Sequence, residues 1–189
     1  MKLTDKIKER RLFRQIKESD KEAFITAYDN YADQIFRFIY FKVNNQEEAQ
    51  DIASAVFLKA WNHVQNNSLT EAKTLRALFY KIARTSVIDY YRKNSRGSAI
   101  SLNDSEVEID PADGSQDALS EIEISSDMEK VQEKLLELKD EYREAIVLKF
   151  INGLSTGEIA EITSKSQGNV RITLHRALKA LRELMGEEK

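Results

Sequence analysis

The fold of this chain is decided by residues 155–184, which read STGEIAEITSKSQGNVRITLHRALKALREL. Ser155 is a good helix N-cap, and Glu158 three residues later completes a capping box, in which each side chain bonds an amide that the helix leaves free. After a short apolar helix and a polar turn, Ser166 caps a second, longer helix. Two capped helices joined by so short a turn predict a helix-turn-helix.

The second helix of this pair has an apolar face and a polar face. The apolar face is one helical stripe, formed by Val170, Leu174, Ala177, Leu178, Leu181, Leu184 and Met185. On the polar face we expect the DNA-binding residues to be Ser166, Gln167, Asn169, Arg171, Thr173, His175, Arg176 and Lys179. The major groove admits one helix, whose first residues reach base edges while basic residues further along meet phosphates. The alternative is an ordinary amphipathic hairpin with a solvated charged face.

The rest of the chain is also patterned as helices. From residue 19 to residue 97, apolar residues recur every three or four positions in three stretches, interrupted at Asn44–Asn45 and at 66–68. Two shorter stripes follow at 128–138 and 141–151. Because no strand-like alternation persists, the sequence predicts an all-α fold with two small helical domains. These are a three- or four-helix N-terminal domain and the C-terminal helix-turn-helix domain.

Charge divides the chain into three blocks. Residues 1–97 hold 18 Lys and Arg against 12 Asp and Glu, residues 98–127 hold none against nine, and residues 128–189 hold eleven of each. We therefore predict an N-terminal domain over 1–97, an acidic flexible linker over 98–127 and a C-terminal domain over 128–189. A segment as polar as the linker cannot bury enough surface to offset its ordering entropy. An alternative role for its acidity is to mimic nucleic acid in a basic channel of a partner.

Composition and motifs argue against several classes of protein. The absence of cysteine excludes disulfides and thiolate metal sites, and His63 and His175 have no ligand-spaced neighbours, so we expect no metal. No Gly-rich phosphate loop or catalytic constellation is present, so we expect neither a cofactor nor an enzyme. No stretch approaches the ~18 apolar residues of a membrane span, and the first residues lack a signal peptide's apolar run. We expect a cytoplasmic protein without membrane insertion.

Several stretches of both blocks resemble one family, the bacterial sigma factors. Residues 142–155, 158–162 and 175–182 resemble their fourth conserved region. Residues 48–61, which read EAQDIASAVFLKAW, resemble the second region, and 78–93 resemble its continuation. The size and the two-block layout are similar to the minimal, extracytoplasmic-function type. The resemblance therefore covers nearly the whole chain except its first residues and the linker.

The resemblance implies a division of labour between the two blocks. Core RNA polymerase would be contacted by Asp51, Ser54 and Ala55, while Phe57 and Trp61 belong to the domain core. The opened minus-ten strand would be held by the loop from about Asn66 to Lys73 and by Tyr80, Arg84, Thr85, Asp89, Arg92 and Lys93. The C-terminal helix would read the minus-thirty-five element of promoter DNA. Family behaviour also implies an anti-sigma factor as a partner.

Some of these residues have a second interpretation. Tyr80 and Tyr90 could stack on bases, as aromatic residues do with single strands, or pack in the core. The chain as a whole could be a stand-alone DNA-binding regulator, which would need only the helix-turn-helix. The separate match to the second region favours a sigma factor.

The chain departs from the family pattern at several positions. Ser54 and Ala55 stand where Gln and Glu are frequent, which affects the polymerase contact. Leu75 and Leu78 stand where Phe and Trp are frequent, which reduces the aromatic surface near the melting site, and Thr85 stands where Asn is usual. In the helix-turn-helix, Thr163–Lys165 makes the turn more polar than usual, and Thr173 replaces a common basic residue. We expect a less tightly packed turn and an altered sequence preference at minus thirty-five.

Overall fold

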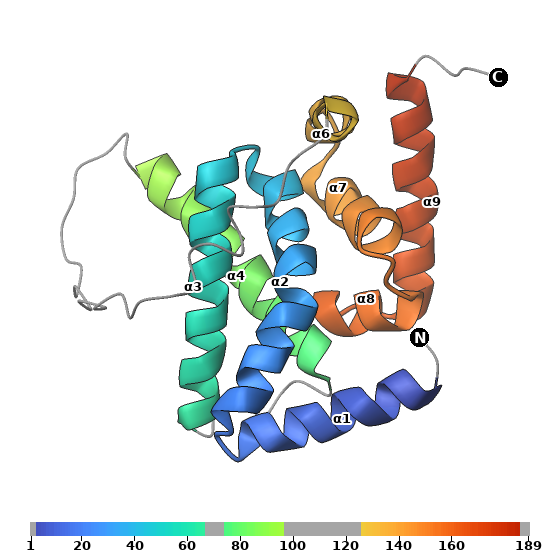
Figure 1. Cartoon of the computed structure of the whole chain (residues 1–189). Helices are drawn as coiled ribbons and strands as arrows, with labels where there is room; N and C mark the ends of the chain where they lie inside the picture. The colour runs from blue at the N-terminus through green and yellow to red at the C-terminus, as the bar shows by residue number, and fades with distance from the viewer. Residues whose placement is uncertain (1–2, 67–73, 97–125, 186–189) are drawn as a thin grey trace.

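The computed structural model describes residues 3–66, 74–96 and 126–185, and every regular element in these residues is a helix (Figure 1). In chain order the elements are α1 (Leu3–Lys17), α2 (Lys21–Val43), α3 (Gln46–Gln65), α4 (Leu75–Arg96), α6 (Ser126–Leu136), α7 (Asp140–Ile146), η1 (Val147–Ile151), α8 (Thr156–Thr163) and α9 (Gln167–Leu184). The all-α prediction is confirmed. Residues 98–125 of the predicted linker lie outside the described residues. Residues 67–73 of the predicted strand-binding loop lie outside them as well.

The helix boundaries in the N-terminal block follow from local capping. The Asp20 carboxylate accepts a hydrogen bond from the Ala23 amide at 3.2 Å and begins α2. At the other end, Asn44 adopts the left-handed conformation with φ 57°, which asparagine tolerates better than most residues. Asn45 then caps α3 by accepting from the Glu48 amide. The predicted start and interruption of this helical pattern are therefore correct.

The N-terminal core lies between α2, α3 and α4, with α1 packed across their lower ends in Figure 1. Phe79 of α4 joins all three helices, since its ring centroid lies 4.9 Å from that of Phe57 and 5.5 Å from that of Tyr31. α1 contributes the buried side chains of Phe13 and Ile16. The aromatic residues of the predicted stripes therefore pack against one another, which gives more than their area burial alone.

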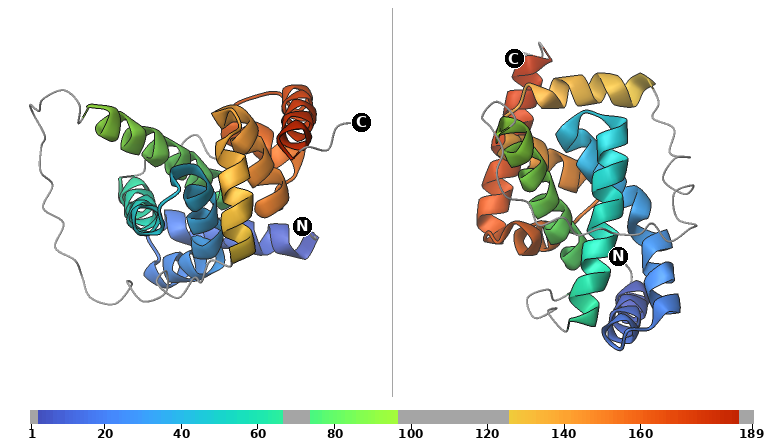
Figure 2. Two further views of the ribbon diagram at one scale, coloured as in Figure 1. Left: turned by 90° about the horizontal axis from the view of Figure 1, so that it is seen from above. Right: turned by 90° about the vertical axis from the view of Figure 1, so that its left-hand side faces the viewer.

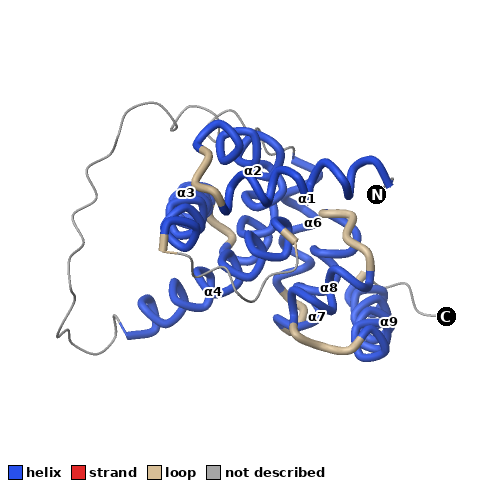
Figure 3. Tube along the Cα trace, turned by 90° about the horizontal axis from the view of Figure 1, so that it is seen from below, coloured by secondary structure: helices blue, strands red, loops and turns tan. Residues whose placement is uncertain are grey.

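The C-terminal helices form a second unit on one side of the first (Figures 2 and 3). α7 and α8 both pack on α9, and the short loops between them are visible in Figure 3. The sequence predicted a single helix over 141–151, but its last turn, η1, is a π-helix. Gly153 follows with φ 67°, a conformation that favours glycine and ends the segment.

The two units pack against each other through charged side chains. The Arg84 Nε of α4 lies 2.9 Å from the Glu144 Oε1 of α7, and the Glu144 side chain is only 7% exposed. Arg76 of α4 pairs with Glu158 of α8 at 3.0 Å. Lys42 at the end of α2 pairs with Asp140 of α7. The sequence predicts two blocks but no contact between them.

Uncharged side chains extend this interface to the backbone of α2. The buried Gln132 of α6 donates a hydrogen bond to the Tyr40 carbonyl at 2.7 Å. Asn152, just after η1, donates to the Gln34 carbonyl at 2.7 Å. Side chains of the C-terminal unit therefore bond the N-terminal unit at both main-chain and side-chain atoms.

We expect Glu144→Ala to lower the free energy of unfolding by about 1–3 kcal/mol, because a buried, charged hydrogen bond is lost. Urea denaturation followed by circular dichroism measures the change. Glu137→Ala is the matched control, since Glu137 forms a 2.9 Å ion pair with Lys134 in which both side chains are about half exposed. That change should stay within about 0.5 kcal/mol. Equal effects of the two variants would contradict the importance of the contact between the units.

Candidate nucleic-acid interface

Both helices of the helix-turn-helix begin at the predicted caps. The Ser155 amide donates to the Glu158 carboxylate at 2.9 Å, and the Glu158 amide donates to the Ser155 hydroxyl at 3.3 Å. This is the predicted capping box. Ser166 caps α9 by accepting from the Asn169 amide at 3.2 Å. The orientation of each helix start is therefore fixed by its own sequence.

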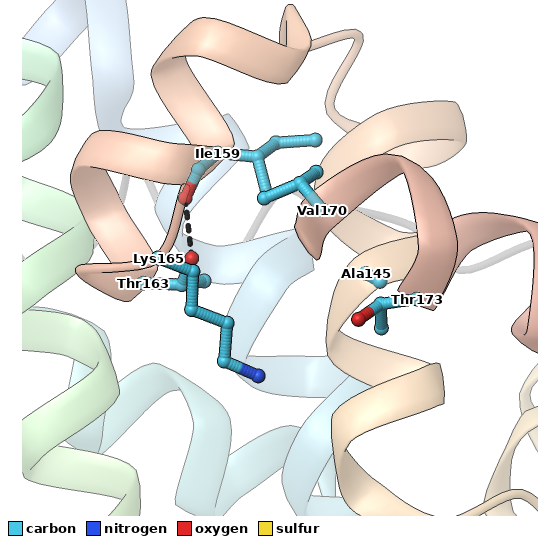
Figure 4. Close-up of a pocket in the computed structure, with 6 residues that line it drawn as sticks. All are labelled: Ala145, Ile159, Thr163, Lys165, Val170 and Thr173. Atoms are coloured by element: carbon cyan, nitrogen blue, oxygen red, sulfur yellow. Dashed lines mark hydrogen bonds between the residues drawn. The ribbon is translucent and has the colours of Figure 1, made fainter. Parts of the chain in front are cut away.

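The turn between the helices is polar but internally bonded. Ser164 adopts the left-handed conformation with φ 56°, and the Lys165 amide closes the turn on the Ala160 carbonyl at 3.0 Å. The Thr163 hydroxyl donates to the Ile159 carbonyl at 2.7 Å (Figure 4). The Lys165 ammonium group bonds the Glu141 carboxylate of α7. The side chains of Thr163 and Lys165, which depart from the family pattern, thus have partners within the domain.

A small hollow lies under this turn (Figure 4). It has a volume of about 10 Å³, which leaves room for one water molecule at most. The residues that line it are Ala145, Ile159, Thr163, Lys165, Val170 and Thr173. The looser packing expected of this polar turn stays a prediction.

One side of α9 is open to solvent along its length. Val170, Leu174 and Ala177 are buried on the opposite side and hold the helix on α7 and α8. The exposed polar residues form what we call the recognition face, and they are Gln167, Asn169, Arg171, His175, Arg176 and Lys179. In Figure 1, α9 lies at the edge of the molecule away from α3. Seven of the eight residues predicted to contact DNA are exposed, these six and the cap Ser166.

Thr173 is the exception among the predicted DNA contacts. Its side chain is buried, and its hydroxyl donates to the Glu141 carboxylate at 3.4 Å. The residue therefore points toward α7 and lies outside the recognition face. Sequence reasoning placed it among the DNA-facing residues because it took a polar side chain to be solvent-facing, whereas Glu141 provides a partner inside.

Sequence reasoning also missed Ile172. This side chain is 52% exposed, between the recognition-face residues Arg171 and His175. The signal was available in the spacing, because position 172 falls outside the apolar stripe through Val170 and Leu174. An apolar residue on the polar side of a recognition helix is a candidate contact.

The residues predicted to hold the minus-ten strand divide into two groups. Thr85, Arg92 and Lys93 are exposed on α4, and Asp89 is half-buried. Tyr80 and Arg84 face the inside of the molecule instead. Tyr80 is fully buried with its ring 5.4 Å from Phe38, which is the core alternative considered for it. The half-buried Arg84 is bonded to Glu144.

A further cation, Arg76, shares this covered side of α4. Positions 76, 80 and 84 are spaced one helical turn apart, so they form a single stripe. The C-terminal unit covers that stripe, with Glu158 bonded at Arg76 and Glu144 at Arg84. In this arrangement of the two units, Tyr80 is fully covered, and the cations of the stripe are paired with carboxylates of the C-terminal unit.

The residues predicted to contact polymerase lie together on the outer side of α3. Asp51 and Ser54 are exposed and Ala55 is half-buried, whereas Ile52, Ala53 and Val56 face the core. Leu58, which is 48% exposed, continues the same side one turn further and was not predicted. The predicted core residue Phe57 is buried, and Trp61 packs on Phe24 at 4.9 Å.

The surroundings of Glu158 shift the pKa of its carboxyl group, and this shift makes the stability of the fold depend on pH. Burial by itself would raise the pKa of this carboxyl, but the hydrogen bonds from Ser155 and the positive charge of Arg76 outweigh it. The net result is a pKa below the usual value. The folded state is therefore stabilised above the unfolded pKa, and this contribution is lost as the pH falls through the folded one.

Comparison with known proteins fits this arrangement. Family models match at residues 27–97 for Sigma-70 region 2 and at residues 128–181 for Sigma-70 region 4. The ECF RNA polymerase sigma factor SigW of Bacillus subtilis is 34% identical over 181 residues, which cover 90% of this chain and 92% of that protein. This chain belongs to the ECF RNA polymerase sigma factors.

A second relative of this sigma factor, RNA polymerase sigma factor SigV of Bacillus subtilis, is 29% identical over 91% of this chain and 96% of its own. The function is accordingly promoter-specific initiation of transcription, as the sequence predicted. The match to region 2 sets aside the alternative of a stand-alone regulator.

Two solved structures share the fold of this sigma factor. CnrH, in complex with the cytosolic domain of CnrY, superimposes with a TM-score of 0.69 at 20% identity and covers 96% of this chain and 99% of its own. The sigma factor RpoE of Bartonella quintana, in complex with the anti-sigma factor NepR, gives 0.65 at 23% identity, with 88% and 98% covered. At sequence identities this low, the structural similarity establishes a shared fold and nothing further. Over the described residues, no helix of this sigma factor is long and apolar enough to cross a membrane.

We expect Ser164→Gly to raise the free energy of unfolding by about 0.5–1 kcal/mol, because glycine adopts the left-handed conformation of this turn without strain. Gly153→Ala is the opposite change at φ 67°, where an added Cβ meets no other atom within 4 Å. It should destabilise by a similar amount through backbone strain alone. Thermal and urea unfolding of both variants test this pair, and changes of the same sign would contradict the explanation.

Proposed function

We propose that this sigma factor reads the minus-thirty-five element with the recognition face of α9, holds the opened minus-ten strand along α4 and binds core RNA polymerase with the outer side of α3. The observation that supports this most is the two-sided character of α9. One side supplies the domain core and the other presents cations and amides to solvent. The protein would work by binding alone, with no covalent step, in the cytoplasm where promoter DNA lies.

On α9, position along the helix suggests which atoms each residue contacts. Gln167 and Asn169 lie in the first turn, where side chains reach base edges and where their amides can pair with adenine. Arg176 and Lys179 lie two to three turns later, where phosphates are the nearer partners. Arg171 lies between and can pair with guanine.

On α4, the exposed Thr85, Arg92 and Lys93 can meet the single strand directly. Arg84 can do so only after it leaves Glu144, which requires the C-terminal unit to separate from α4. The distance between promoter elements demands the same separation, because one unit must reach upstream while the other holds the melted strand. We infer that the arrangement described above is a closed form and that promoter binding requires an open one.

An anti-sigma protein is a further partner that we propose. The solved RpoE structure is a complex with such a factor, and the family resemblance implied one from the sequence. A protein that contacts both units would hold the closed form. Purification from the native host that yields polymerase subunits and nothing else would refute it.

We expect Asp51→Lys to weaken binding to core RNA polymerase by about tenfold or more, because it reverses a charge in the centre of the proposed contact. Binding is measured with purified core enzyme by fluorescence anisotropy. Asp29→Lys makes the same reversal at an exposed position of α2 and should leave the affinity unchanged. Equal losses in both variants would point to net charge and away from a contact at α3.

We expect Arg176→Ala to lower the affinity of the reconstituted holoenzyme for its promoter and to reduce the slope of log affinity against log salt by about 1. Lys21→Ala removes the same charge from the exposed first turn of α2 and should change neither quantity. An unchanged salt slope in Arg176→Ala would contradict a phosphate contact at this residue.

A further inference from the structure

We propose that Ile172 selects a thymine in the minus-thirty-five element by packing on the C5-methyl group in the major groove. The inference rests on the proposed function of α9 and identifies a base that the helix would prefer. Its starting point is the exposure of Ile172, which leaves 52% of a branched apolar residue in water.

Ile172 lies at the middle of the recognition face. With 100° of rotation per residue, the positions that flank it on the helix surface are 168, 175, 176 and 179. All four are exposed. The buried Val170 and Leu174 lie on the far side, where they hold α9 to the domain. A helix that enters a groove with its exposed side would therefore bring Ile172 to the groove floor.

Gly168, one turn before Ile172, supports a close approach of DNA at this point. Gly168 is the second residue of α9, and a reason for glycine at this position has to come from its surroundings. Packing gives none, because an added Cβ would meet only the Ser166 hydroxyl, at 3.9 Å. A missing side chain on the open surface allows a neighbouring molecule to come nearer to the helix axis and to the side chain of Ile172.

The surroundings of Ile172 favour DNA over a protein partner. A protein-docking surface needs several adjacent apolar side chains, whereas Ile172 is flanked by Arg171, His175, Arg176 and Lys179. The next large exposed apolar residues, Leu184 and Met185, lie at the far end of α9. They are 12 and 13 positions further along the chain, or about 18–20 Å away. An apolar side chain with basic neighbours is complementary to a DNA groove, where an apolar group on a base lies between two rows of phosphates.

The major groove offers one such group. Thymine presents a C5-methyl there, while adenine, guanine and cytosine present hydrogen-bonding atoms that isoleucine cannot pair with. Contact with the methyl removes apolar surface from water on both partners. Ile172 therefore adds thymine selectivity to a face whose other members bond adenine, guanine or phosphate.

The experiment uses the full chain with core RNA polymerase. Promoters are first selected from a library randomised at minus thirty-five, and each selected thymine is then replaced singly by uracil, which lacks only the methyl. We expect one replacement to weaken promoter binding by about three- to fivefold, the value of one buried methyl group. In Ile172→Ala the same replacement should have no effect.

The matched control is Ile25→Ala, which removes an isoleucine that is 53% exposed on α2. This variant should keep the full sensitivity to uracil. The proposal is overturned if no thymine is sensitive in the unaltered protein, or if Ile172→Ala retains the sensitivity. A library that yields no preference at minus thirty-five contradicts the proposed function of α9 itself, so the two failures are distinguishable.

Discussion

The carboxylate of Glu158 joins the two units and shapes the helix-turn-helix at once. One of its oxygens accepts from Ser155 and closes the start of α8, while the other lies 3.0 Å from Arg76 of α4. The Arg76 amide in turn donates to Glu9 of α1, whose carboxylate also accepts from the Tyr31 hydroxyl. A continuous path of hydrogen bonds therefore runs from α1 through α4 to the DNA-binding domain.

The chemistry of this interface suits a contact that has to open. The charged side chains of this interface are largely buried, so desolvation offsets much of the attraction within each pair, while removal of one partner leaves the other unpaired. The carboxylates of Glu158 and Glu144 bond the cations of α4, and DNA phosphates carry the same charge. In the open form that we propose, phosphate would take the place of carboxylate at Arg84. The buried apolar residues of the two units belong to one continuous core, so opening also exposes apolar surface.

The features that the sequence predicts are formed by residues close together in the chain. The features that it does not predict depend on contacts between residues far apart in the chain. The caps at Asp20, Asn45, Ser155 and Ser166 involve residues three positions apart, so the sequence alone identifies them. The contacts between the units join residues 60 to 118 positions apart across the predicted linker, and the sequence composition does not reveal such pairing. From the sequence, Tyr80 could either stack on bases or pack in the core. The packing of Phe38 and the C-terminal unit around its ring, which the sequence does not reveal, places it in the core.

Two of the departures of the helix-turn-helix from its family pattern, Lys165 and Thr173, are connected through one residue. Glu141 of α7 accepts from both Lys165 and Thr173, and the bond from Lys165 lowers the pKa of its carboxyl. With Thr173 turned inward to this carboxylate, its position no longer offers the basic contact that is common in the family. The neighbouring Ile172 is exposed in the middle of the same face. On this face, an inward threonine and an exposed isoleucine thus stand side by side, and the thymine contact that we propose would supply selectivity where the threonine position supplies no cation.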